Sequence, residues 1–479
     1  MSQRISGECP IVSSDDDLLG FTSKAENLST TLLNSTPPVM IGLFSPWGSG
    51  KTSMLNLVKD QIGRDGDFRR LRIHHAGILP VFFDTWDHED SLGLIPKLVL
   101  RIADEIERSQ YGLEGKVDDL KQSAGRVAGA VLLTLLDVGV RSATMGMVDT
   151  RLIESAKNYA SGEKDPESWA KKVQRNPHHQ LAVELADLMT KVRSYGYSRV
   201  ALLIDDIDRC HPENVFDFLD NIRRLLTLTE RVRGERSNPQ NLAGFVGIIA
   251  ADEKILSSSI QARYPGADPD VYGHLAKLIT IRQRIPTPDK WALTNFLTKK
   301  ILPAAGDTAN YAKVIDCLAT VASSSSGSLT PRHVLSVMRQ YAASFIPQEN
   351  ANPVGPFTGT AFDENQTFAA VSLALFSIVD PPRCNILFRL HQEGMKDLTY
   401  VCRLALSCMT DSSSHKDSDR GAYHRDCHRS LDEDWRGCKH VHLFKLLYQY
   451  FETCSEKTQN MQFISGNVVN AAMRIAGSA

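Results

Sequence analysis

Residues 45–52 decide the fold of this chain, and they read Ser45-Pro46-Trp47-Gly48-Ser49-Gly50-Lys51-Thr52. The six residues before them, 39–44 (VMIGLF), predict a buried parallel strand, because the run is short and apolar. Apolar residues spaced by three or four positions follow over 54–62 and predict a helix. A strand, a glycine-rich turn and a helix N-terminus in this order predict a phosphate-binding loop, or P-loop.

The loop supplies what a bound phosphate needs. Gly48 and Gly50 permit backbone angles that direct successive N–H groups at phosphate oxygens, and the helix dipole adds to that field. Ser45 stands where the pattern G-x-x-x-x-G-K-[ST] has its first glycine, but serine is small and suits a turn, so we expect the loop to form. A chance Lys-Thr after a turn is the alternative. We predict that the nucleotide is bound by Ser45, Pro46, Trp47, Gly48, Ser49, Gly50, Lys51, Thr52 and Ser53.

A second motif favours the nucleotide site over that alternative. Residues 200–204 (VALLI) predict a central strand, and Asp205 and Asp206 follow it at the end where open α/β sheets bind ligands. We expect Thr52 and Asp205 to hold Mg²⁺, directly or through water. We expect Asp206 to act as general base on the attacking water. An acidic strand end alone is usually a solvated turn, but here a P-loop lies roughly 150 residues upstream.

The remaining pattern predicts an α/β fold, a parallel sheet flanked by helices. Further strands are expected over 79–86, 245–252 and 279–285, and a helix from Pro212. A helical insertion, about 92–194, separates the two motifs. Its apolar run, 127–136, is shorter than the roughly 20 residues of a bilayer span, so we expect a buried or partner-facing helix and no transmembrane segment.

The two ends of the chain are expected to be helical. Ser14 or Asp15 is a plausible cap for a helix that ends before Pro37. Thr330 caps a helix that would direct Arg332 at a γ-phosphate as a third catalytic group, or leave it as a surface arginine. We expect a linker over 345–360, and three domains: a P-loop core (1–290), a helical lid (291–345) and a mainly helical C-terminal domain (356–479).

Composition restricts the function. Lys and Arg number 54 and Asp and Glu 56 among 479 residues, a net charge of −2 that argues against a nucleic-acid motor. The 9 cysteines are scattered and no signal peptide precedes them, which favours free thiols and a cytoplasmic protein. No Asn-Lys-x-Asp segment is present, which favours ATP over GTP.

One cluster of metal-ligand residues lies near the C-terminus. Structural zinc takes four nitrogen or sulfur ligands. The spacing here matches no common zinc finger and lacks C-x-x-C pairs, so exposed loop residues are the expectation and zinc the alternative. The zinc ligands would be His424 and Cys427, with Cys438 and His440 or His442.

These segments resemble the KAP family of P-loop NTPases. Residues 42–53, 83–86 and 204–210 carry the resemblance, above all the Trp47 within the P-loop and the DDIDRC run. It implies an ATPase that changes conformation and signals to partners, often in bacterial anti-phage defence systems such as the Qat type. Related ATPases often carry a polar residue where this chain has Ala250 and Ala251, which implies slow hydrolysis or a substitute role for Asp252.

The leading hypothesis is a Mg²⁺-dependent ATP hydrolase, a switch or motor within a multiprotein complex. Lys51, Asp206 and Arg332 are its expected catalytic residues, Asp208 has a supporting role, and Arg209 is a candidate contact across subunits of a homo-oligomer. A nucleotide-gated scaffold with little turnover is the alternative, followed by a nucleic-acid motor.

Overall fold

The computed structural model describes residues 9–65, 77–89, 93–109, 118–143, 158, 165–235, 242–262, 270–301, 308–324, 329–344, 346–348, 351–354, 364–392, 443–445, 447–449 and 461–476. The chain divides into two compact units. Residues 10–17 and 21–285 form the first, here called the sheet unit. Residues 286–479, with 1–9 and 18–20, form the second, the helical unit.

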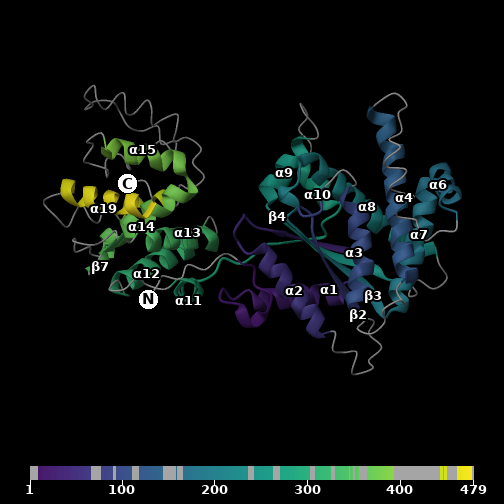
Figure 1. Cartoon of the computed structure of the whole chain (residues 1–479), viewed down its shortest axis with the longest axis horizontal. Coiled ribbons are helices and arrows are strands. Elements are labelled where there is room, and N and C mark those ends of the chain that lie inside the picture. The colour runs from purple at the N-terminus through teal and green to yellow at the C-terminus, as the bar shows by residue number, and fades with distance from the viewer. Residues whose placement is uncertain are drawn as a thin grey trace. The chain divides into compact units, whose positions relative to one another are not determined.

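The sheet unit contains a five-stranded parallel sheet in the order β2-β3-β4-β1-β5 (Figure 1). Strand β4 separates the strands of the two motifs, β1 and β3. Phe44 pairs with Ala251 and Asp84 pairs with Asp205, so the C-terminal ends of neighbouring strands lie side by side. The P-loop follows β1 and the acidic motif follows β3, so both lie at the C-terminal end of the sheet. The strands are β1 (Val39–Phe44), β2 (Gly77–Asp84), β3 (Tyr197–Asp205), β4 (Gly244–Ala251) and β5 (Ile281–Gln283).

Helices cover the sheet because its central strands are buried on both faces; every residue of β4 is buried. The predicted α/β fold with a helical insertion is thereby confirmed. The helices outside the insertion are α1 (Thr22–Asn34), α2 (Lys51–Asp65), α8 (Pro212–Glu235), α9 (Glu253–Ala262) and α10 (Val271–Ala276). Those of the insertion are α3 (Leu94–Ser109), α4 (Asp118–Ala143), α6 (Pro166–Arg175) and α7 (Pro177–Ser194).

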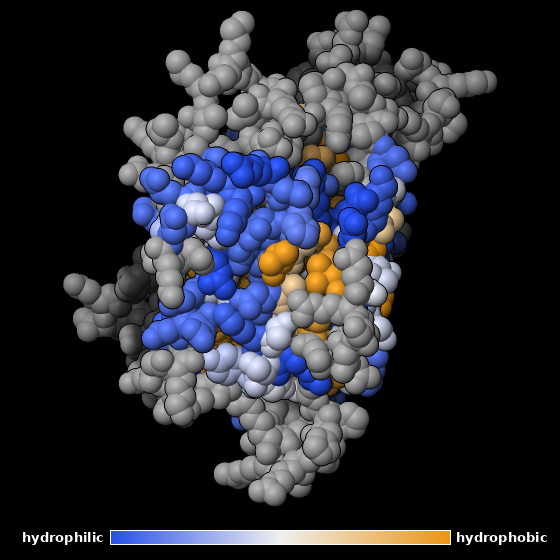
Figure 2. All heavy atoms as spheres, turned by 90° about the vertical axis from the view of Figure 1, so that its right-hand side faces the viewer, coloured by the Kyte–Doolittle hydropathy of each residue, from blue (hydrophilic) through white to orange (hydrophobic). Residues whose placement is uncertain are grey.

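The apolar run of the insertion lies in α4. Its residues 127–133 are all buried, and most of their apolar side chains belong to the core of the sheet unit. The side chains of 134–140 lie outside the description. Within the part of the chain that the structure describes, no helix combines the length and apolar character that a bilayer span requires. The face on the side of α6 and α7 is mainly hydrophilic, with a small apolar area (Figure 2).

The segment before β1 differs from the sequence prediction. A short 3₁₀ helix covers Ser14–Asp16 with Ser13 as its cap, and the chain turns at Gly20, where φ is 75°. Helix α1 begins only at Thr22, whose N–H and hydroxyl both donate to Asp17 Oδ2 at 2.7 Å. The predicted start at Ser14 or Asp15 was therefore wrong, because these polar residues stabilise a separate turn.

The helical unit has its own apolar core. Where we predicted an irregular linker, β6 (Ile346–Gln348) and β7 (Ala351–Val354) form a two-stranded antiparallel sheet. The predicted helical character of the C-terminal region is confirmed for its described residues. The helices are α11 (Lys290–Lys300), α12 (Thr308–Ser324), α13 (Pro331–Ala343), α14 (Glu364–Val379), α15 (Pro381–Gln392) and α19 (Met461–Ala476).

Candidate functional site

The P-loop connects the end of β1 to the start of α2. Gly48 and Gly50 have φ angles of 79° and 97°, in the left-handed region that glycine occupies without strain. A Cβ on Gly50 would also lie 2.7 Å from Cε2 of Phe21, which is buried directly before α1. Gly50 is therefore required both by its backbone angle and by the close packing of Phe21.

Ser45 uses all three of its polar groups. Its N–H donates to the Ala251 carbonyl at the end of β4 (3.1 Å), and its carbonyl accepts from Lys51 Nζ (3.0 Å). Its hydroxyl accepts from the N–H of Ile285 (3.1 Å) in a buried contact. A glycine at this position would leave that buried N–H without its partner, which gives a physical reason for the departure from the usual pattern.

Lys51 is buried, with 6% of its surface exposed, and Asp208 is its nearest carboxylate partner. Lys51 Nζ lies 3.6 Å from Asp208 Oδ2. The same oxygen accepts from Trp47 Nε1 (2.9 Å) and from the N–H of Asp252 (2.6 Å). Asp208 thus connects the P-loop lysine, the P-loop tryptophan and the end of β4.

Asp205 ends β3 and is fully buried. Its main-chain carbonyl accepts from the N–H and the hydroxyl of Thr85 at 3.1 and 2.7 Å, but neither carboxylate oxygen has a hydrogen-bond partner of normal geometry. Burial raises the pKa of Asp205 to about 6, and the negative charges of Asp206 and Asp84 add to that shift. The nearby Thr52 hydroxyl opposes it. A buried carboxylate without a partner is costly, and a bound cation would satisfy its oxygens.

Asp206 adopts φ 54° and ψ 24°, and it is the sole described residue other than glycine with a positive φ. Such a backbone costs energy and is concentrated at functional sites. Arg209 Nε lies 3.0 Å from Asp206 Oδ1, and the Arg209 guanidinium lies 5.5 Å from the centroid of the Trp86 ring. Burial raises the pKa of Asp206, and the charge of Arg209 opposes this. The carboxylate that we predicted as general base is therefore held by an arginine.

The donor set fits a magnesium ion. Mg²⁺ prefers oxygen ligands and is commonly held by one or two protein groups together with phosphate oxygens and water. The unpartnered oxygens of Asp205 and the Thr52 hydroxyl, which follows Lys51 in the first turn of α2, match that requirement. No group of three or more His, Cys, Asp or Glu among the described residues forms a metal cage. The candidate zinc ligands between residues 424 and 442 lie outside the described residues.

Two of the predicted residues, Ser53 and Asp252, have other contacts. The Ser53 hydroxyl accepts from the N–H of Ile11 (3.3 Å), which anchors the N-terminal segment on α2. Asp252 Oδ1 accepts from the N–H of Lys254 (3.0 Å), so this side chain caps α9. Arg332 lies in α13 of the helical unit, after the cap Thr330, and its contact with a phosphate stays a prediction.

Sequence reasoning did not single out Phe21, Asp84 and Thr85 as part of the site. Asp84 follows an apolar run in β2, as Asp205 does in β3, and this repeated strand-then-acid pattern was the available signal. The role of Phe21 carries no sequence signal, because its contact with Gly50 depends on the path of the N-terminal segment.

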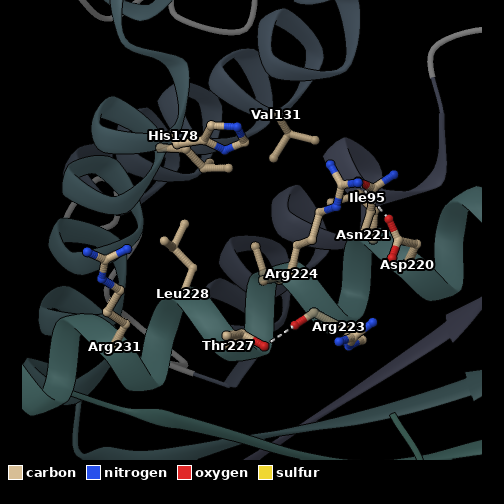
Figure 3. A pocket seen from close by; sticks show the side chains of 12 residues that line it. Ile95, Val131, His178, Asp220, Asn221, Arg223, Arg224, Thr227, Leu228 and Arg231 are labelled. Atoms are coloured by element: carbon tan, nitrogen blue, oxygen red, sulfur yellow. Dashed lines mark hydrogen bonds and ion pairs between the residues drawn. The ribbon is translucent and has the colours of Figure 1, made fainter. Parts of the chain in front are cut away.

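A separate pocket of about 670 Å³ lies between α8 and helices α3, α4 and α7 (Figure 3). Apolar side chains and three arginines line it, and one of these arginines, Arg224, pairs with Asp220 at 2.8 Å. None of the residues of the P-loop or the acidic motif lines it.

The strand order and the pairing of P-loop and acids define a P-loop NTPase of the class with an additional strand between the two motif strands. The profile of the KAP family P-loop domain matches residues 21–344, and the chain belongs to that family. This confirms the resemblance seen in the sequence.

Two solved structures are similar to the chain only distantly. The Aeropyrum pernix ORC2 protein in ADPNP–ADP complexes has 11% identity, covers 91% of this chain and 94% of its own, and has a TM-score of 0.35. The Aeropyrum pernix ORC1 protein in complex with DNA has 14% identity, covers 91% and 83%, and has a TM-score of 0.29. No curated protein sequence matches the chain.

Proposed function

We propose that this protein is a Mg²⁺-dependent ATP hydrolase. The observation that supports this most directly is that Asp205, with two buried and unpartnered carboxylate oxygens, ends the strand at the sheet edge that also carries the P-loop. A bound cation would satisfy those oxygens, and ATP would bring it together with its phosphates.

The P-loop and Lys51 bind the phosphates in this proposal. The N–H groups at the start of α2 point toward the anion, and the Lys51 ammonium exchanges its contact with Asp208 for a phosphate oxygen. Magnesium, held by Thr52 and Asp205, would neutralise charge that develops on the phosphates. Because Lys51 is already buried and oriented, little side-chain order is lost on binding.

Asp206 accepts the proton of the attacking water. The water oxygen forms a bond to the γ-phosphorus, the bond to the bridging oxygen of ADP breaks, and the products are ADP and inorganic phosphate. Asp206 carries its ion pair with Arg209 through Oδ1, so Oδ2 is the atom that would face the water. Arg332 is proposed to approach the γ-phosphate from the helical unit, on the strength of its capped helix alone.

Phosphate release by the purified full chain tests the proposal. Lys51→Ala should abolish tight nucleotide binding, and Asp206→Asn should keep binding but lower turnover by about 10²–10⁴-fold. EDTA should stop turnover in the wild type. Normal turnover in Asp206→Asn would exclude it as the base, and absent nucleotide binding in the wild type would overturn the function.

A gated scaffold with little turnover is the second candidate. It is supported by Ala250 and Ala251, which offer no polar side chain at the end of β4, and by Asp252, whose carboxylate caps α9. Tight MgATP binding without phosphate release, with and without added partners, would favour it. A nucleic-acid motor has less support, because the net charge is −2.

The wider role is proposed from family likeness. We propose that nucleotide turnover drives a switch or motor in a multiprotein complex, in a homo-oligomer to which Arg209 contributes, and in anti-phage defence. Arg209 is partly exposed, at 36% of its side chain, as a contact across subunits requires.

A further inference from the structure

Ser45 is the one position at which the P-loop departs from the usual glycine pattern, and its hydroxyl binds a residue 240 positions away in sequence. Ile285 is the last residue of the sheet unit, and the helical unit resumes at Pro286. The hydroxyl of the first P-loop residue therefore holds the peptide at which the chain leaves the sheet unit.

The segment after that peptide is short and stiff. Residues 286 and 288 are prolines, which fix φ and restrict the preceding residue to extended conformations. Asp289 then caps α11 by accepting from the N–H of Ala292 (2.7 Å). Because few torsions are free between Ile285 and α11, the orientation of the Ile285 peptide has a large influence on the direction of the chain beyond it.

Ser45 is also next to the phosphate-binding chemistry. Its carbonyl accepts from Lys51 Nζ at 3.0 Å, and Lys51 is the group that exchanges partners when phosphate binds. Two contacts within one residue, carbonyl to Lys51 and hydroxyl to Ile285, connect the phosphate cation with the exit peptide. Its N–H donates to the Ala251 carbonyl at 3.1 Å, so Ser45 is also bound to the end of β4.

We infer that Ser45 is a positioning residue whose hydroxyl couples nucleotide occupancy of the P-loop to the 285–289 segment. This inference rests on the proposed nucleotide binding at the same loop. In this inference the Ser45 hydroxyl controls the position of the Ile285 peptide and does not contact the phosphates.

Hydrogen exchange at the Ile285 amide measures the coupling. Within residues 285–288 only Ile285 and Thr287 carry a backbone N–H, so a peptide that covers the segment reports on few sites. The full chain is measured without nucleotide and with saturating MgADP or a non-hydrolysable MgATP analogue. A fluorescent ATP analogue measures affinity for each variant separately.

We expect the Ile285 amide to be protected in the wild type and to change its exchange rate when nucleotide binds. Ser45→Ala and Ser45→Gly should exchange this amide about tenfold faster, because its buried partner is lost, and should no longer respond to nucleotide. Ser45→Thr, which keeps a hydroxyl, should restore both properties. Thr229→Ala removes a buried hydroxyl of α8 that donates to the Leu225 carbonyl (2.8 Å), outside the P-loop, and should leave Ile285 exchange as in the wild type.

The outcomes distinguish the coupling through Ser45 from the proposed ATP hydrolysis. Wild-type exchange at Ile285 in Ser45→Ala, or a nucleotide response that persists there, overturns the coupling while the ATPase proposal stands. A loss of nucleotide affinity beyond about tenfold in Ser45→Ala also overturns it, because the hydroxyl would then serve the phosphates. Absent nucleotide binding in the wild type overturns the proposed function, and the coupling with it.

Discussion

Two groups of ionised side chains within the sheet unit are built in opposite ways. In the insertion, Glu184 accepts from Arg126, Trp169 and Gln180 at 2.8, 3.0 and 2.8 Å. Asp187 accepts from Ser123, Arg126 and Lys191. We call these side chains the insertion network. At the C-terminal end of the sheet, neither carboxylate oxygen of Asp205 has a hydrogen-bond partner of normal geometry, although the Thr52 hydroxyl is nearby, and Asp208 Oδ1 has none.

The difference distinguishes side chains that hold helices together from side chains that are arranged to bind a ligand. A network in which every charge has a partner holds α4, α6 and α7 together and needs nothing further. Carboxylates left without partners at a strand end are stable only because the surrounding fold supports their cost, and a ligand removes that cost. Substitutions should therefore have opposite effects on stability in the two places.

The largest effect is expected for Glu184→Ala. It leaves the partly buried guanidinium of Arg126 and the indole N–H of Trp169 without their acceptor, which should lower the free energy of unfolding by about 3–5 kcal/mol. Urea unfolding of the full chain measures this, and Glu184→Gln, which keeps an acceptor, should lose less. A loss under about 1 kcal/mol is what an exposed ion pair contributes, so it would show that the insertion network is not a strong stabilising element and would contradict the comparison.

Asp205→Asn should stabilise the nucleotide-free protein. The pKa of Asp205 is about 6 in the folded chain against 3.8 for the ordinary group, so its ionised form costs about 3 kcal/mol. The folded state binds the extra proton, so stability is lost as pH rises from about 4 to about 6. The gain in Asp205→Asn should therefore be full at pH 8 and small at pH 4.

Asp187→Asn is the matched control, and it should change the stability of the protein in the opposite direction. Burial alone would raise the pKa of Asp187, but hydrogen bonds from Ser123 and Lys191 and the charge of Arg126 lower it overall. This substitution should destabilise the protein at pH 8 and lose its effect as pH falls through the acid range. Thermal unfolding of both variants without magnesium at pH 5 and 8 checks the pair, and equal signs at pH 8 would contradict the comparison.

A smaller effect is expected for Gly50→Ala. A Cβ at φ 97° is strained and would meet Phe21 at 2.7 Å, so stability should fall by about 1–3 kcal/mol and nucleotide affinity should fall with it. Gly63→Ala, at an exposed position of α2 with no atom within 4 Å of the new Cβ, should gain about 0.5–1 kcal/mol. Equal effects of the two substitutions would mean that the loop geometry does not depend on glycine.

The elements that were predicted correctly are those whose signal lies within a short stretch of the sequence. Five strands were expected, four from short apolar runs and one from the alternation over 279–285, and all five form. Burial on both faces of a parallel sheet leaves a continuous apolar signal in the central strands, whereas β5 lies at the end of the strand order and is only partly buried. The start of α1 was not predicted, because Ser and Asp residues stabilise a turn as readily as a helix start, and here Ser13 caps the short 3₁₀ helix that contains Ser14 and Asp15. The β6–β7 sheet was read as a linker, since Pro, Gly and Asn there suggested irregular chain.

The sequence by itself determined the class of this protein and the residues proposed for its site, because a glycine-rich loop and an acidic strand end leave their residue types in fixed local order. Tertiary structure alone decided how those residues are partnered. Asp208 meets Trp47 and Lys51 across 161 and 157 positions of sequence, and Ser45 meets Ile285 across 240. Such contacts depend on strand order and register, which no local pattern encodes.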